Sequence, residues 1–247
     1  MELVLTILFQ YIRENPSSDT GVCIAKILIQ NLEKILTLSL EGTAELCMCS
    51  PSTFTRFLKT LGIENFKELR KMISFPKNVY MTNDFDANEY SRHIIYNIQE
   101  VNQTLDKAQI RDFAYHIFNA RRVIILAFPT NYFPLLDFQC KMMMNGKFIE
   151  VLPYSQKDQE LSSLNRDDLV IVISFQGNFF IENHINDKLN AAHVKKILIT
   201  QSIEKQYNDF HTVIKCGTFG YYGESLYSLM YLLNLLNIEY KDLISGK

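Results

Sequence analysis

Hydroxyl and cationic side chains gather on one face of a helix that the sequence predicts over residues 51–61. The apolar residues of that helix recur at helical spacing and are expected to face a core, which leaves the polar ones outside. Short hydroxyls and cations on a helix can bond to base edges and phosphates in the major groove of DNA. The inward set is Phe54, Phe57, Leu58 and Leu61, and the outward set is Ser52, Thr53, Thr55, Arg56 and Lys59.

Strong start and stop signals flank this helix. Ser50 is expected to cap its N-terminus, and Pro51 suits the first helical position because the N–H there has no intrahelical partner. Gly62 suits the left-handed conformation that ends many helices. The boundaries of the helix are therefore set by local chemistry.

A shorter helix is predicted just upstream, over residues 41–47, with Ala44 and Leu46 facing inward. Only the break at Met48 and Cys49 separates it from the next helix. Two short helices around so tight a break indicate a helix-turn-helix, in which the second helix enters the major groove. The alternative is a small helical bundle whose polar face is merely solvated.

Local charge favours a DNA-binding helix-turn-helix over a small helical bundle. Between residues 56 and 77 six cations stand against two carboxylates, Glu64 and Glu68, although the whole chain carries a net charge of −2. Neutralised phosphates supply most of the non-specific affinity for DNA, so a basic stripe belongs beside a recognition helix. The predicted DNA-binding residues are Ser50, Ser52, Thr53, Thr55, Arg56, Lys59, Lys67, Arg70 and Lys71.

A second set of polar side chains follows short apolar runs in the second half of the chain. If these runs are parallel strands, the loops after them lie together at one sheet edge, where helix N-termini attract anions such as phosphate. The alternative is that these side chains only cap the helices that follow. The predicted ligand-binding residues are Thr130, Asn131, Ser174, Gln176, Gly177, Asn178, Thr200 and Ser202.

The elements that position both sets are readable from the same sequence. Residues 1–75 show helical periodicity almost throughout, and two further helices are predicted over 90–105 and 107–119. Five apolar runs then alternate with segments long enough for helices, which indicates a parallel α/β sandwich. The runs are 123–127, 148–152, 168–174, 196–200 and 212–216.

These patterns divide the chain into a helix-turn-helix domain over 1–75, a polar linker over 76–90 and an α/β domain over 91–247. The last helix, over 222–236, is strongly apolar, so it is expected either to bury against a second copy or to cover the sheet.

Composition narrows the class of protein further. Of the 247 residues 47% are hydrophobic, yet no apolar run approaches the roughly 20 residues that span a bilayer. The N-terminus lacks a signal-peptide pattern and the five cysteines are scattered, so we expect a cytoplasmic protein without disulfides. Cys47 and Cys49 are expected to be small buried residues. No catalytic triad, metal cluster or phosphate-binding glycine loop is recognisable, so no enzyme activity, metal or cofactor is expected.

The segment from Leu38 to Ile73 resembles the N-terminal domain of the RpiR-type bacterial transcriptional regulators, which control sugar and amino-sugar catabolism. The resemblance implies a C-terminal SIS (sugar isomerase) domain, and with it an α-helical domain followed by a five-stranded parallel sheet. The matching positions are Ala44, Leu46, Ser50, Ser52, Thr53, Arg56, Phe57, Leu61 and Gly62, followed by Phe66 and Leu69.

The ligand loops depart from the SIS pattern. The usual G-x-G-x-S after the first strand is Ala-Phe-Pro-Thr-Asn over 127–131, and the loop from Ser174 keeps its first serine and its glycine but has Ile181 where a glutamate is usual. These losses count against isomerase chemistry, which needs a placed acid or base. Three aromatics near the mouth, Phe128, Phe175 and Phe179, favour a less charged effector.

The sequence therefore predicts a regulator of carbohydrate metabolism, controlled by a sugar-phosphate-like effector. Its expected partners are double-stranded operator DNA, the effector and further copies of the chain, as a homodimer or homotetramer, with no membrane. The alternatives are an isomerase-type enzyme and a regulator whose effector pocket is vestigial.

Overall fold

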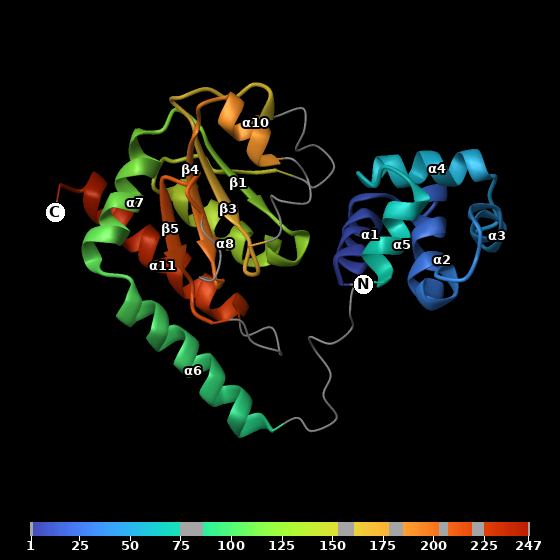
Figure 1. The fold of residues 1–247 in the computed structure, drawn as a ribbon, viewed down its shortest axis with the longest axis horizontal. Helices are drawn as coiled ribbons and strands as arrows, with labels where there is room; N and C mark the ends of the chain where they lie inside the picture. Colours follow the sequence, from blue (N-terminus) through green and yellow to red (C-terminus); the bar gives the residue numbers. More distant parts are fainter. Residues whose placement is uncertain are drawn as a thin grey trace. The chain divides into compact units, whose positions relative to one another are not determined.

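The computed structural model describes residues 2–74, 86–152, 161–177, 185–202, 207–218 and 225–246 (Figure 1). These residues form two compact units, one within residues 2–74 and one within the described residues from 86 to 246. The first unit is helical, and the second is a parallel sheet covered by helices, which confirms the predicted fold class.

The helices of the first unit surround one apolar core that draws side chains from all of them. Phe54, Leu58 and Leu69 are among its fully buried members. Capping fixes where the second helix starts, because the Asp19 carboxylate accepts the N–H of Val22. The helices are α1 (Glu2–Glu14), α2 (Thr20–Ile35), α3 (Leu40–Leu46), α4 (Pro51–Thr60) and α5 (Phe66–Ser74).

The turn between α3 and α4 closes with a non-glycine residue in the left-handed region. Met48 has φ 53°, and its N–H and that of Cys49 donate to the carbonyls of Glu45 and Ala44, at 2.9 and 3.0 Å. This is the double hydrogen bond of a Schellman motif. The expected inward position of Leu46 is wrong: Leu46 is half-exposed and Cys47 is buried, because residues two apart on a helix, such as Ala44 and Leu46, lie on nearly opposite sides, whereas residues three apart share a face.

The start and the end of α4 follow the predicted signals. The Ser50 hydroxyl accepts the N–H of Thr53 at 3.1 Å, with Pro51 at the first helical position. Gly62 takes φ 75° at the other end, and the N–H of Ile63 donates to the carbonyl of Leu58 at 2.9 Å. These bonds satisfy backbone groups that a helix leaves open at its ends.

The sheet of the second unit contains five parallel strands in the order β2-β1-β3-β4-β5. Each of the five predicted runs forms one strand, and the register pairs Ala127 with Ile173 and Ile173 with Ile199. The order reverses between β1 and β3, which makes their carboxyl ends the switch point of the sheet. The strands are β1 (Val123–Ala127), β2 (Glu150–Val151), β3 (Leu169–Ile173), β4 (Lys195–Thr200) and β5 (Thr212–Lys215).

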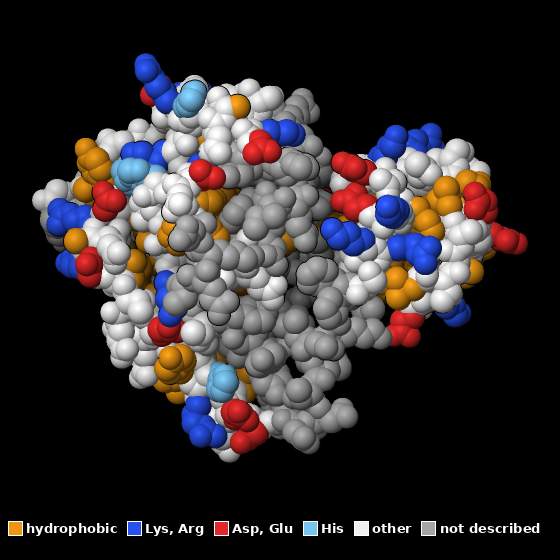
Figure 2. All heavy atoms as spheres, viewed as in Figure 1, with side chains coloured by type: hydrophobic (Ala, Val, Ile, Leu, Met, Phe, Trp, Pro, Cys, Tyr) orange, Lys and Arg blue, Asp and Glu red, His pale blue; other side chains and the backbone are white. Residues whose placement is uncertain are grey.

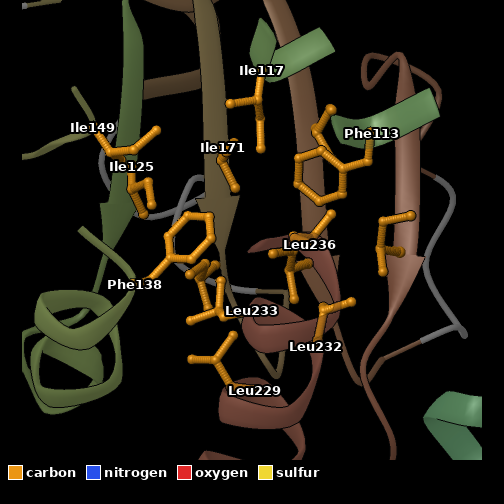
Figure 3. Close-up of a cluster of buried hydrophobic side chains, with 14 of the residues drawn as sticks. Phe113, Ile117, Ile125, Phe138, Ile149, Ile171, Leu229, Leu232, Leu233 and Leu236 are labelled. Carbon is orange, nitrogen blue, oxygen red and sulfur yellow. The ribbon is translucent and has the colours of Figure 1, made fainter. Parts of the chain in front are cut away.

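The strands are covered on both faces. Alternate strand residues such as Ile125 and Ile171 face one core, and their neighbours face another. Figure 3 shows Phe138 and Leu233 reaching toward these two isoleucines in the first core, which α6, α7, α8 and α11 complete. The second core contains Leu189 of α10. The helices are α6 (Ala87–Thr104), α7 (Lys107–Asn119), α8 (Tyr132–Met144), α10 (Ile185–Ala191) and α11 (Ser225–Ile244), and a short 3-10 helix, η1 (Pro129–Asn131), precedes α8.

Two of these helices differ from expectation. α6 begins at Ala87, within the segment expected to be a linker, and its Ile95 is exposed. α11 continues to Ile244 and buries Leu229, Leu232, Leu233 and Leu236 in the first core. Of the two roles expected for the last helix, covering the sheet is the one observed.

Polar side chains close the amino edge of the sheet. Arg121 pairs with the buried Asp168 at 2.7 Å. His116 of α7 lies between Lys195 and His211, with 3.1 Å from its Nδ1 to the lysine Nζ and 3.2 Å between the two histidine Nε2 atoms. Burial, and then the charge of Lys195, lower the pKa of His116 below its usual value, against the opposing effect of Asp112.

The two cysteines before α4 differ in burial, and the described ranges contain neither a cluster of potential metal ligands nor a helix that could span a bilayer. Cys47 is buried, and burial raises the pKa of its thiol to about 12, whereas Cys49 is only half-buried. Over the same ranges no three histidine, cysteine or carboxylate side chains lie close enough to share a metal ion. None of the described helices combines the length and the apolar character needed to cross a bilayer.

The strained turn at Met48 predicts that Met48→Gly stabilises the first unit. A non-glycine residue in the left-handed region costs about 1 kcal/mol, and the Met48 side chain is exposed, so its removal loses little packing. We expect a free energy of unfolding about 1 kcal/mol higher in urea titrations followed by circular dichroism. Gly62→Ala, which creates the same strain at the end of α4, should lower it by a similar amount; a destabilised Met48→Gly would contradict the argument.

Candidate functional site

The predicted DNA-binding face of α4 lies outside the core of the first unit. Ser52, Arg56 and Lys59 are exposed, and Thr53 and Thr55 are half-buried. The predicted inward residues are all buried, so the two faces of the helix separate as expected from their spacing.

The hydroxyl groups at the start of α4 bond to one another and to the backbone. The Ser50 Oγ lies 2.9 Å from both the Ser52 Oγ and the Thr53 Oγ1. The Thr55 hydroxyl donates to the carbonyl of Pro51 at 2.9 Å. Ser50 therefore has a structural role as the cap, and Thr55 is held against its own helix. The described hydrogen bond of the Ser52 hydroxyl is to the Ser50 side chain and not to the backbone, and Ser52 is exposed.

Most of the cationic side chains on α4 and α5 have no internal hydrogen-bond or ion-pair partner among the described residues. Within the described part of the chain, the side chains of Arg56, Lys59, Lys67 and Lys71 form no hydrogen bond or ion pair. Arg70 differs, because its guanidinium donates to the carbonyl of Leu36 and lies 5.9 Å from the centre of the Phe66 ring. Figure 2 shows lysine and arginine side chains over α4 and α5. Cations without an internal partner can neutralise phosphate without first breaking a contact within the protein.

The second candidate site lies at the carboxyl edge of the sheet. The register places the ends of β1, β3 and β4 side by side, so the loops that follow them meet there. Two bonds tie these loops together: the N–H of Ser174 donates to the carbonyl of Ile199, and the N–H of Gln201 donates to the carbonyl of Phe175, each at 3.0 Å.

The loop after β1 presents a buried amide and the start of a long helix. Asn131 is 4% exposed and precedes α8, yet its side chain neither caps that helix nor bonds to another described residue. Pro134 lacks an N–H, so it removes one of the donors that a helix start normally offers. Thr130 is half-buried beside it. An amide without a protein partner is available to bond to water or to a ligand.

The loop after β3 is a tight turn. Ser174 is buried, and its carbonyl accepts the N–H of Gly177 at 3.0 Å. Gly177 has φ 68°, and the Tyr207 hydroxyl occupies the place that a Cβ at Gly177 would need. Gln176 between them is exposed. Sequence reasoning missed Tyr207, since nothing in the spacing links it to a glycine 30 positions earlier.

The side chains at the start of the loop after β4 form hydrogen bonds that join neighbouring loops and strands. The Thr200 hydroxyl is buried, donates to the carbonyl of Phe175 and accepts the N–H of Ser202, both at 3.2 Å. These two bonds give Thr200 a role in joining the loops. Gln201, which the sequence did not single out, donates to the carbonyl of Cys216 at 2.8 Å and accepts the hydroxyl of Ser225 at 2.7 Å. It joins β4, β5 and the start of α11.

The charged groups described at this edge are Lys215, at the end of β5, and Glu100 of α6, which form an ion pair with each other, and the loops themselves are neutral. Residues 128–131, 174–177, 200–202 and 216–218 contain no acidic, basic or histidine side chain. Phe128 and Phe175 are half-buried there. Asn178 and Phe179 lie outside the described residues.

Comparison with known proteins shows what the second unit is similar to. A model of the SIS domain family matches residues 116–214, from the last turn of α7 to β5. No curated protein sequence matches the chain significantly.

Solved structures share this fold at low sequence identity. The Vibrio vulnificus NanR protein complexed with ManNAc-6P is 13% identical, with a TM-score of 0.55 over 98% of this chain and 92% of that one. The sugar isomerase domain of the RpiR transcription factor from Sphaerobacter thermophilus is 15% identical, with a TM-score of 0.53 over 64% of this chain and 90% of that one. A phosphoheptose isomerase from Francisella tularensis is 16% identical, with a TM-score of 0.51 over 68% of this chain and all (100%) of that one. The chain thus contains an SIS-like α/β domain, a fold found in regulators and in isomerases.

The contact between Gly177 and Tyr207 predicts that Gly177→Ala destabilises the second unit more than an ordinary left-handed glycine does. Gly146 is the matched control, because it has φ 80° and open space where a Cβ would stand. Gly146→Ala should lower the free energy of unfolding by about 1 kcal/mol, from backbone strain alone. Gly177→Ala should lower it by about 2–4 kcal/mol, because it adds the clash. If urea titrations show that both variants lose the same free energy of unfolding, Tyr207 moves aside at little cost and the clash argument is wrong.

Proposed function

We propose that this protein is a DNA-binding transcriptional regulator of carbohydrate metabolism, whose SIS domain binds a sugar-phosphate-like effector. The observation that carries the proposal is the combination, in one chain, of an SIS domain with a helix that exposes Ser52, Arg56 and Lys59 without internal partners for the two cations. The RpiR-type resemblance of the sequence points the same way.

On the DNA side, α3, the turn and α4 act as a helix-turn-helix. α4 enters the major groove, where Ser52, Thr53 and Arg56 reach base edges or phosphates. Lys59, Lys67 and Lys71 hold the phosphate backbone. Ser50, Thr55 and Arg70 contribute chiefly by fixing the shape of this surface, since each is bonded within the unit.

On the effector side, the ligand binds at the carboxyl edge of the sheet, next to the start of α8. Asn131 supplies a side-chain amide without a partner among the described residues, and the helix N-terminus supplies a favourable field for a phosphate. Thr130, Ser174, Gln176, Gly177, Asn178 and Ser202 are the other proposed contacts, and Thr200, which completes the predicted set, supports the loops through its own hydrogen bonds. Supporting this ligand class, one of the structures with the same fold, that of NanR, is described as a complex with ManNAc-6P.

The rival function is that of an isomerase, because a phosphoheptose isomerase shares the fold. The neutral side chains in the described loops count against it, since proton transfer needs a positioned acid or base. Turnover of hexose or amino-sugar phosphates that disappears in Ser174→Ala would establish the rival and displace our proposal.

Regulation then requires two arrangements of the DNA-binding domains. The effector must bind the two arrangements with different affinity, because a ligand with equal affinity for both does not change the equilibrium between them. We place the protein in the cytoplasm, as a homodimer or homotetramer that reads a roughly palindromic operator.

The first prediction of this proposal concerns Arg56→Ala. Binding to DNA from the upstream region of the protein's own gene should weaken by about 10- to 100-fold if Arg56 reads a base. Unrelated DNA should then be bound almost as before. If Arg56 instead contacts a phosphate, both DNAs should lose affinity equally, and the slope of log affinity against log salt should fall by about 1. Fluorescence anisotropy over a salt series measures both quantities.

Arg13→Ala is the matched control, because Arg13 is an exposed cation of the same unit, on α1. It should leave operator affinity nearly unchanged. Unchanged specific affinity in Arg56→Ala would refute the role of α4 as a recognition helix.

The second prediction concerns Asn131→Ala. A panel of sugar phosphates that includes ManNAc-6P should contain a compound that raises the melting temperature, because it binds only the folded state. In Asn131→Ala the affinity for that compound should fall about 10-fold, since one hydrogen bond to the ligand is lost. The unphosphorylated sugar is the control. If no compound raises the melting temperature of the unmodified protein, the effector site is vestigial.

A further inference from the structure

A buried asparagine joins α6 to the loop that follows β5. Asn97 is 1% exposed, and its Oδ1 accepts the N–H of Thr218 at 2.6 Å and the Thr218 hydroxyl at 3.3 Å. Its amide nitrogen donates to the carbonyl of His93, one turn earlier in α6, at 3.1 Å. The oxygen and the nitrogen of this side chain are both bonded, which fixes its orientation and holds the loop against the helix.

The loop approaches α6 closely beside this asparagine. Gly217 has φ 76°, and a Cβ there would lie 2.4 Å from the Asn97 Oδ1. Three residues further along the same face of α6, the carboxylate of Glu100 forms an ion pair with Lys215 at the end of β5. The α6–β5 contact, as we call it, therefore consists of the bonds from Asn97 to Thr218 and from Glu100 to Lys215.

The loop after β5 is also bonded to the loops of the candidate ligand site. The carbonyl of Cys216 accepts the side-chain N–H of Gln201 at 2.8 Å. The backbone N–H of Gln201 donates in turn to the carbonyl of Phe175, in the loop after β3, at 3.0 Å. Hydrogen bonds and a short piece of backbone therefore connect the loop after β3 to α6.

α6 is the helix through which the chain enters the second unit. Residues 75–85, which lie outside the described residues, link its start to α5 of the first unit. None of its first ten residues, 87–96, is buried, and Asn97 is the first that is. Figure 1 shows this first half of α6 extending away from the sheet. The α6–β5 contact therefore lies where the exposed half of the helix meets the packed half.

We propose that the α6–β5 contact transmits the state of the ligand loops to the DNA-binding domain, with Asn97 as the positioning residue. A ligand that moves the loop after β3 moves Gln201 and the loop after β5, and Asn97 converts that movement into a tilt of α6. The exposed half spans about 15 Å, so a tilt of about 10° displaces the start of α6 by about 2–3 Å. The inference rests on the proposed function and adds the route by which its two sites communicate.

The test measures how strongly a sugar phosphate changes the affinity for DNA. Fluorescence anisotropy with labelled DNA from the upstream region of the protein's own gene gives the Kd with and without saturating ManNAc-6P, followed by the other compounds of the panel. In the unmodified protein the two Kd values should differ by about 10-fold or more. In Asn97→Ala this ratio should fall below about 3, while DNA and sugar phosphate, each measured alone, should bind within about three-fold of their usual affinity.

A second variant and a matched control make the result specific to the contact. Glu100→Ala removes the ion pair from the other bond of the contact and should also lower the ratio; alanine suits a helix interior, so α6 is kept. Asn102→Ala is the control, because Asn102 of α6 is exposed and accepts the hydroxyl of Tyr231 in α11, away from the loop after β5. Its ratio should equal that of the unmodified protein.

The outcomes separate this inference from the function on which it rests. A full ratio in either contact variant, with normal circular dichroism, overturns the inference and leaves the proposed function standing. A ratio that Asn102→Ala lowers equally overturns it too, because any loosening of α6 would then have the same effect. An unmodified protein whose DNA affinity no sugar phosphate of the panel changes has nothing to transmit, and this result overturns effector control and the inference together.

Discussion

The central strands of the sheet are buried along both faces, and this constraint organises the second unit. Every residue of β1 and β3 is buried, so each strand needs an apolar layer above and below it. α6, α7, α8 and α11 form one layer, and α10 belongs to the other. Parallel strands joined by helices also bring all their carboxyl ends to one edge. The position of the candidate ligand site is a consequence of how the apolar runs are buried.

The features that follow from local chemistry could be predicted from the sequence, and those that depend on contacts distant in the chain could not. Ser50 and Gly62 mark the ends of α4 because capping is decided within a few residues. The apolar runs predicted all five strands for the same reason. The left-handed conformation of Met48 could not be predicted from the sequence, because residues other than glycine rarely adopt it. Thr200 and Tyr207 acquire their roles from loops that only the folded sheet brings together.

The surface against which the last helix packs could not be predicted from the sequence either. Its apolar pattern required burial but did not say against what, since a sheet and a second chain offer equivalent surfaces. The structure uses α11 for the sheet and leaves the unmatched apolar face on α8, which the sequence did not single out. That helix begins at Tyr132, directly after Asn131, and its exposed apolar side chains include Phe133, Leu136 and Met143.

The histidine pair at the amino edge has a consequence for acid conditions. His116 and His211 bring their Nε2 atoms to 3.2 Å, so protons on both nitrogens would repel each other. Because the pKa of His116 is lowered in the folded state, the unfolded chain binds this proton at a higher pH. Its contribution to stability is complete above the usual histidine pKa and is lost as the pH falls from there to the lowered value. Mild acid therefore weakens the amino edge of the sheet, opposite the edge where the ligand loops meet.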